Sequence, residues 1–347
     1  MQDAKIFENK GIWVLLIVLV SVASSSLIRF VTSPATPSPD LANKQQKYDS
    51  IQDAKFRSLF ESGDKAVQNG QYADALANYG EAEKVVPQLN EERYILLKNA
   101  REHIAALYAA AGSRGEAEGV YKTMIDSTFR DGATHLHSGQ LESALARYQD
   151  ATELTEHLTD SKGDNKKIRL IQCNNATVET LRQMGRFADA VNTTQQLIDR
   201  IQSSADEYDP AIIQVYMQLA ETYQMQKDWE HLEQTLLTSS ALCDKLIAHY
   251  AGYAGRPDSD NPAWMVPVNE DQLLYALIDA YDKDGKPDLA LATAQTLYDF
   301  IAQHSTSWNE LQPHTRKNVA QLAFQVASKR NLPDAMGTWR ERMEQSR

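Results

Sequence analysis

A short pattern that recurs along the chain constrains its fold more than any other feature. The stretch NGQYADALANYGEA (69–82) has an alanine five places after a turn glycine, and six later stretches repeat this arrangement. The turn positions are Gly70, Gly112, Gly139, Gly185, Lys227, Gly285 and Arg330. The residues five places after them are Ala75, Ala117, Ala144, Ala190, Leu232, Ala290 and Ala335. Alanine at one position in six of seven copies predicts repeated structural units over residues 56–347.

Side-chain size alternates around each turn, which predicts two antiparallel helices that pack closely. Where short helices cross, only a small side chain lets the two backbones approach. The residues seven places before the turn are mostly small: Gly63, Ala105, Gly132, Val178, Ala220, Ile278 and Ala323. Large rings stand nine places after the turn in several copies: Tyr79, Tyr121, Tyr148 and Trp339. Because the sequence has no long alternating run typical of a strand, the predicted fold class is all-α.

These features resemble the tetratricopeptide repeat (TPR) family, whose signature runs W-x2-L-G-x2-Y, then A-x3-F, then P. The first copy matches best through LFESGDKA (59–66), Tyr72, Ala75, Tyr79, Ala82 and Pro87. The leading Trp is missing from every copy, and the final Pro is kept only in the first. The resemblance implies a superhelical solenoid of about seven helix-turn-helix repeats. Four of the six turn-to-turn spacings are 42–46 residues, which is similar to the longer repeats of the kinesin light chain type.

Two turn-to-turn spacings are irregular. The third turn follows the second by only 27 residues, so MIDSTFRDGATH (124–135) either joins two shortened helices or continues as one helix. The sixth turn follows the fifth by 58 residues, and a stretch rich in Gly, Pro, Asp and Asn predicts an inserted loop at about 250–271. Its Tyr250, Tyr253 and Trp264 have two interpretations: they cover a joint between repeats, or they form a binding flap.

The resemblance also implies a binding surface. In TPR proteins the first helix of each pair lines a concave groove, with residues ten and six places before the turn pointing into it. These two positions are four residues apart and therefore share one face of the helix. The candidate protein-binding residues are Phe60, Asp64, Phe129, Glu179, Met217, Glu221, Tyr275, Asp279 and Phe324. Acids beside aromatic and apolar residues favour basic, amphipathic partner segments, although the acids also fit a merely solvated face.

The amino terminus differs in kind from the repeats. Residues 11–28, GIWVLLIVLVSVASSSLI, carry no charge, and their helical length of about 27 Å matches the apolar core of a bilayer. We expect an amino-terminal tail and transmembrane anchor at 1–31, a Pro/Ser-rich linker at 32–55 and the solenoid at 56–347. The protein is then a single-pass membrane protein with its solenoid exported to a periplasmic or other extracytoplasmic space. A signal peptide cut near Ala23 and Ser25, which would release a secreted protein, is the alternative.

The sequence shows no recognisable catalytic constellation. It has no phosphate loop, dinucleotide fingerprint or helical zinc pair, so no enzyme activity, cofactor, metal or small-molecule substrate is expected. A net charge of -12 argues against nucleic acid as a partner. Cys173 and Cys243 fall in different repeats and are predicted to be buried free thiols. Two hypotheses remain. The chain is a membrane-tethered scaffold or adaptor for protein or peptide partners, or it is a structural subunit of a larger envelope or secretion assembly.

Overall fold

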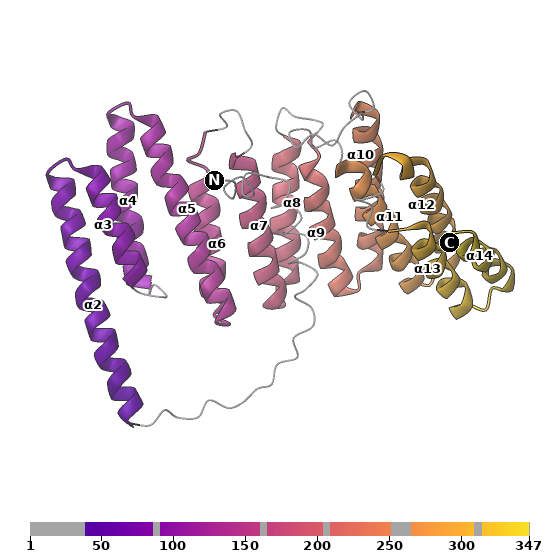
Figure 1. Cartoon of the computed structure of the whole chain (residues 1–347), viewed down its shortest axis with the longest axis horizontal. Helices are drawn as coiled ribbons and strands as arrows, with labels where there is room; N and C mark the ends of the chain where they lie inside the picture. Colours follow the sequence, from indigo (N-terminus) through magenta and orange to yellow (C-terminus); the bar gives the residue numbers. More distant parts are fainter. Residues whose placement is uncertain are drawn as a thin grey trace, which may run out of the picture. The chain divides into compact units, whose positions relative to one another are not determined.

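A computed structural model describes residues 39–85, 91–159, 165–203, 209–250, 265–308 and 314–346. Within these ranges the chain forms thirteen α-helices and no strand, which confirms the all-α prediction (Figure 1). The helices are α2 (Pro39–Gln68), α3 (Tyr72–Val85), α4 (Glu91–Ala110), α5 (Arg114–His137), α6 (Leu141–Thr155), α7 (Asn165–Gln183), α8 (Phe187–Gln202), α9 (Ala211–Gln226), α10 (Trp229–Tyr250), α11 (Met265–Lys283), α12 (Pro287–Trp308), α13 (Arg316–Lys329) and α14 (Pro333–Gln345).

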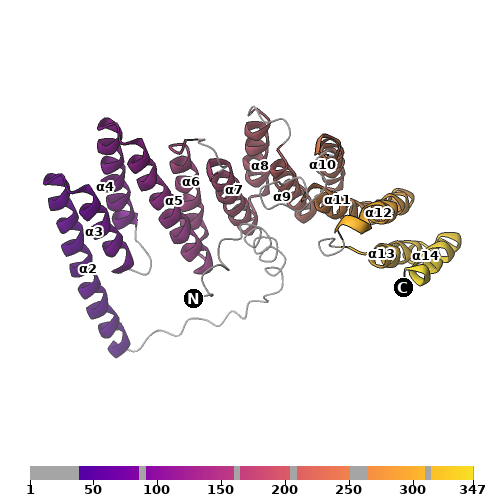
Figure 2. The ribbon, with the colours of Figure 1, turned by 45° about the horizontal axis from the view of Figure 1, so that its top comes forward.

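The helices belong to two units. The first unit ends at Arg186 and holds α2–α7, and the second begins at Phe187 and holds α8–α14. Inside each unit, successive helices run up and down and pack against their neighbours in chain order (Figures 1 and 2). One pair departs from this rule, because α3 and α4 touch at only a few points.

The helix pairs turn on residues with a left-handed backbone. Five of these residues are predicted turn glycines, with φ between 72° and 80°, a conformation that glycine adopts without a Cβ clash. Lys227 takes the same conformation at φ 59°. In the first turn Gln71 N donates to Ala66 O over 2.9 Å, which satisfies a carbonyl that has no partner inside α2.

The last turn lies one residue beyond its predicted position. We expected it at Arg330, but the left-handed residue is Asn331, at φ 54°. A 2.9 Å hydrogen bond from Leu332 N to Ala327 O closes it as in the first turn. Asparagine visits this conformation more readily than most residues because its short polar side chain bonds locally. The packing residues predicted from Arg330 are nevertheless buried: Ala323 has no exposed surface and Trp339 is 4% exposed.

Small residues lie where the helices of a pair cross, as predicted. Four of the repeated alanines have no exposed surface: Ala75, Ala144, Ala190 and Ala290. A Cβ placed on Gly63 would clash with the ring of Tyr79, and one placed on Gly132 would lie 2.9 Å from the ring of Tyr148. Because glycine has no side chain, its place on the first helix of each pair leaves room for the tyrosine ring of the second helix.

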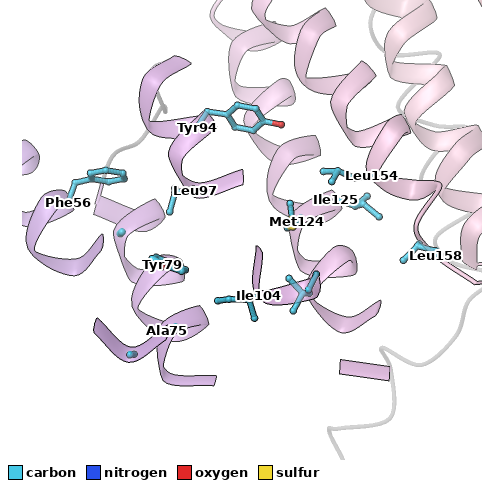
Figure 3. Close-up of a cluster of buried hydrophobic side chains, with 14 residues drawn as sticks. Phe56, Ala75, Tyr79, Tyr94, Leu97, Ile104, Met124, Ile125, Leu154 and Leu158 are labelled. Atoms are coloured by element: carbon cyan, nitrogen blue, oxygen red, sulfur yellow. The ribbon is translucent and has the colours of Figure 1, made fainter. Parts of the chain in front are cut away.

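One apolar cluster runs through five helices of the first unit (Figure 3). Phe56 of α2, Tyr79 of α3, Leu97 of α4, Met124 of α5 and Leu154 of α6 all belong to it and are buried. A single pair of helices cannot cover its own apolar faces, so neighbouring pairs complete the core. The cluster therefore connects α2–α6 even though α3 and α4 diverge.

The short spacing between the second and third turns is explained by α5. Arg114–His137 is one continuous helix, which packs against both α4 and α6. It is the second helix of one pair and the first helix of the next. Of the two interpretations of MIDSTFRDGATH, the single continuous helix is the one found.

Two predicted boundaries shift. Helix α2 begins at Pro39, so residues 39–55, which we assigned to the linker, are helical. Proline suits a first helical turn because its missing N–H would have no partner there. Helix α11 begins at Met265, so residues 265–271 of the expected loop are helical as well. Tyr253 and Trp264 lie outside the described residues.

The predicted transmembrane segment at 11–28 also lies outside the described residues. Among the residues that the structure describes, no helix is both long and apolar enough to cross a membrane.

Candidate partner-binding surfaces

In the first unit, the predicted groove aromatics pack against the second helix of their own pair. The Phe60 ring lies 5.2 Å from that of Tyr79, and the Phe129 ring lies 5.1 Å from that of Tyr148, centre to centre. Asp64 accepts a 2.6 Å hydrogen bond from the Tyr79 hydroxyl. Burial, and then this carboxylate, raise the pKa of Tyr79. Phe60 and Phe129 are half-buried, so only part of each ring is open to a partner.

The predicted groove acid of α7 already has partners on its own helix. Glu179 accepts hydrogen bonds from Arg182 at 2.6 Å and from Gln183 at 3.0 Å. Arg182 is buried, whereas the Glu179 side chain is 40% exposed. A neighbouring cation therefore offsets the charge that this acid presents to a partner.

In the second unit, two first helices lie side by side and bring predicted residues together. Gln224 of α9 donates a 3.3 Å hydrogen bond to Asp279 of α11, whose other partner is Lys283 at 2.5 Å. Glu221 is exposed one turn before Gln224, and Met217 is half-buried one turn earlier still. We call Met217, Glu221, Tyr275 and Asp279 the acidic face of α9 and α11.

Tyr275 is held in place by contacts with a polar cluster that the sequence analysis did not predict. Its ring stacks on His314 with centres 3.8 Å apart and planes 5° from parallel. His314 Nδ1 lies 2.6 Å from Asp271, which is fully buried. Burial, and then Asp279, raise the pKa of Tyr275. The local signal was an acidic pair inside an apolar helix, NEDQLL (269–274), whose first three residues we had assigned to a loop.

Phe324 of α13 is half-buried, and its place in a groove stays a prediction. Its partner is Arg340, whose guanidinium lies 5.5 Å from the ring centre. Ala323 and Trp339, the predicted small residue and large ring of this helix pair, are both buried.

The first unit contains a groove that the sequence did not indicate. It has a volume of about 780 Å³ and lies between α3 and α5, with α4 at its floor. Ala73, Leu76, Gly80, Glu83 and Lys84 of α3 line one wall. The opposite wall includes Glu116, Gly119, Val120, Thr123, Ser127 and Arg130 of α5. A glycine inside each of two helices, at Gly80 and Gly119, was the available signal.

Arg101 of α4 ties the two walls together at one end of this groove. It donates to Glu83 of α3 over 2.8 Å and to Ser127 of α5 over 3.2 Å. Arg101 is only 5% exposed and lies at the floor of the groove. Because it is buried and already hydrogen-bonded, little of its positive charge is available to a partner.

A buried charged network joins α4, α5 and α6 in the same unit. Arg147 of α6 is 1% exposed. It donates to Asp131 of α5 and to Glu91 of α4, each over 2.8 Å, and its guanidinium lies 3.5 Å from the centre of the Tyr94 ring. A guanidinium fits this place because it stacks on a ring while it donates in its plane. These contacts hold the three helices together.

The thiols and acids of the described residues form no recognisable reaction centre. Cys173 and Cys243 are both free and buried, as predicted, and burial raises the pKa of Cys173 to about 11. A thiol with so high a pKa is a poor nucleophile near neutral pH. Within the described part of the chain, no three His, Cys, Asp or Glu side chains are grouped to hold a metal ion.

Comparison with known proteins finds similarity only among solved structures. No family model and no curated protein matches the chain. BtubC (BKLC) from P. vanneervenii is similar at 15% identity and a TM-score of 0.41, over 76% of this chain and 95% of that one. The apo form of RapI is similar at 11% identity and a TM-score of 0.39, over 84% and 96% of the two chains. A tetratricopeptide repeat protein from Parabacteroides merdae ATCC 43184 is similar at 13% identity and a TM-score of 0.31, over 84% and 93%.

Proposed function

We propose that this chain is a membrane-tethered, TPR-like adaptor that binds segments of partner proteins on the first helices of its pairs. The observation that carries the proposal is the acidic face of α9 and α11. There, the 3.3 Å bond between Gln224 and Asp279 sets two first helices side by side. Glu221 is exposed there, while Met217 and Tyr275 keep part of their apolar surface open.

The chemistry of this face favours a basic, amphipathic segment. Carboxylates steer a cationic partner toward the surface, while apolar and aromatic side chains hold it once water is excluded. Lys283 lies on Asp279 at 2.5 Å and reduces the local negative charge. We therefore expect modest affinity with a clear dependence on salt.

Binding of a labelled basic amphipathic peptide at two salt concentrations tests this proposal. The double variant Glu221→Lys with Asp279→Asn should weaken binding about tenfold and flatten its salt dependence, because it removes negative charge from the face. Glu230→Lys is the matched control, since Glu230 is exposed on α10 outside the face. If the peptide binds the double variant as tightly as the parent, or if its acidic counterpart binds better, the face is not the site.

The tether is proposed from the uncharged run at residues 11–28. An apolar helix of that length spans a bilayer core, and it would hold the repeats close to one membrane surface. A permanent subunit of a larger envelope or secretion assembly is the alternative use of such a chain. Size on a native column, after mild detergent extraction, separates the two: an adaptor elutes near its own mass, whereas a permanent subunit elutes with its assembly.

A further inference from the structure

The groove of the first unit exists because one helix contact of the repeat is missing. Elsewhere the second helix of one pair packs along the first helix of the next, as α6 does on α7 and α10 does on α11. α3 and α4 touch at few points, which leaves the groove of about 780 Å³ between α3 and α5. These two helices run in the same direction because α4 returns between them (Figure 1). From Ala73 to Lys84 the groove follows α3 for about 17 Å, or three helical turns.

The walls of the groove allow another backbone to come close. A Cβ placed on Gly80 or on Gly119 would have no atom within 4 Å, so the structure itself does not explain either glycine by packing. Glycine weakens the interior of a helix, whereas it lets a neighbouring helix approach to the shortest interaxial distances. Leu76, Val120 and Tyr108 supply apolar surface between the walls.

The two ends of the groove differ in charge. Glu116 is exposed at one end, in the first turn of α5. Lys84 and Arg130 are exposed at the other end.

Three carboxylates near Arg130 already have arginine partners within the chain, whereas the exposed Glu81 pairs with Lys84 itself over 2.8 Å. Glu83 accepts from Arg101, and Asp131 accepts from Arg147. Asp126 likewise accepts from Arg169. The charge left to meet a ligand is therefore negative at the Glu116 end, and at the Lys84 end it is positive through Arg130, because Glu81 offsets Lys84.

We propose that this groove binds an amphipathic α-helix of a partner protein. Three observations define the partner. The groove follows α3 for about three turns, its glycines admit a close backbone, and Leu76, Val120 and Tyr108 give it apolar surface for one stripe of side chains. The charges set the direction: the bound helix carries a basic residue beside Glu116 and an acidic residue beside Arg130. This surface lies in the first unit and does not depend on the acidic face of α9 and α11.

A display library of amphipathic helical peptides tests the proposal directly. The peptides are about four turns long, so that they cover the groove, and both ends are randomised among acidic and basic residues. The library is panned against the full chain. We expect enriched peptides with one acidic and one basic end. Their affinity should fall about tenfold or more for Gly80→Leu with Gly119→Leu, which fills the groove. Gly115→Leu is the matched control: Gly115 lies on the same helix, also faces open space, and does not line the groove.

A second variant keeps the test independent of the filled glycines. Lys84→Glu with Arg130→Glu changes only exposed side chains and should reverse the preferred end charges of the enriched peptides. The proposal is overturned if no helical peptide is enriched, or if the enriched peptides bind the filled variant as tightly as the parent. If instead the parent is a dimer on a native column and the filled variant a monomer, the occupant is a second copy of this chain. If the peptides fail only on Glu221→Lys with Asp279→Asn, they bind the acidic face, and the proposed function survives without the groove.

Discussion

The glycines inside the helices have opposite roles that depend on what faces them. Gly63 and Gly132 each face a tyrosine ring that leaves no room for a Cβ. Gly80 and Gly119 face open space and gain nothing from packing within the chain. Close packing makes the first two indispensable to their helix pairs, whereas the other two weaken the isolated fold.

Replacing Ala144 with leucine tests the crossing positions. Ala144 has no exposed surface, so three added carbon atoms must displace a neighbouring helix, and overpacking should lower the free energy of unfolding by about 1–3 kcal/mol. Ala146→Leu on the same helix is the control, because Ala146 is exposed. Thermal melting of both variants makes the comparison. Equal melting temperatures would show that the alanines do not mark helix crossings.

At the scale of helices, buried polar contacts decide how neighbouring elements are held. Arg147 joins three helices of the first unit through Asp131, Glu91 and Tyr94. In the second unit Glu270 of α11 is 4% exposed and accepts a 2.6 Å hydrogen bond from Ser240 of α10. Such contacts are costly to bury and more costly to break on one side only.

Arg147→Ala should destabilise the protein by about 3–5 kcal/mol, because Asp131 would remain buried without its guanidinium partner. Arg114→Ala should change stability by no more than about 0.5 kcal/mol, since Arg114 is exposed on α5. Denaturant unfolding of the two variants measures the difference. A small loss for Arg147→Ala would mean that solvent reaches Asp131.

Stability should fall as pH rises from about 4.5 to about 7 because of Glu270. Burial raises the pKa of this carboxyl from 4.5 to about 7. Between these two values the folded state keeps a proton that the unfolded state releases. The stabilisation is therefore complete below about pH 4.5 and is lost as pH rises through 7. The loss in the free energy of unfolding is at most about 3 kcal/mol.

Glu270→Gln carries no titrating proton and should flatten this part of the pH dependence. Melting of parent and variant from pH 5 to pH 8 gives the comparison. Parallel curves would show that the carboxyl is solvated in the folded protein.

At the scale of the whole molecule, the amino-terminal segment decides where the repeats act. We expect the protein to pellet with membranes, to resist extraction by high salt and to retain residues 1–28, because the uncharged run at 11–28 is long enough to span a bilayer. Intact-mass measurement of the mature protein decides between an anchor and a signal peptide. A mature chain that begins after about residue 25 would establish cleavage. Protection of the repeats from protease in intact cells would reverse the expected orientation.

The sequence alone was sufficient for features that depend on near neighbours. A left-handed turn needs one residue with little steric penalty, and a helix crossing needs one small side chain, so both recur at fixed offsets and can be read along the chain. Six of the seven turns, the buried alanines and the contact of Gly63 with Tyr79 were predictable in this way. The seventh turn was misplaced because Arg330 and Asn331 are adjacent and neither is glycine.

Only the tertiary structure decided which distant residues meet. Arg147 and Glu91 are 56 residues apart, and Arg169 and Asp126 are 43 apart, so no local pattern shows that these charges neutralise each other. The divergence of α3 from α4 is likewise invisible in either helix, because it depends on how whole pairs pack. The candidate acids were therefore predictable as positions on helices, whereas the charge they leave for a partner was not. The groove lined by Gly80 and Gly119 follows from the same physics: a short pattern sets the helices, and the sum of many long-range contacts sets the spaces between them.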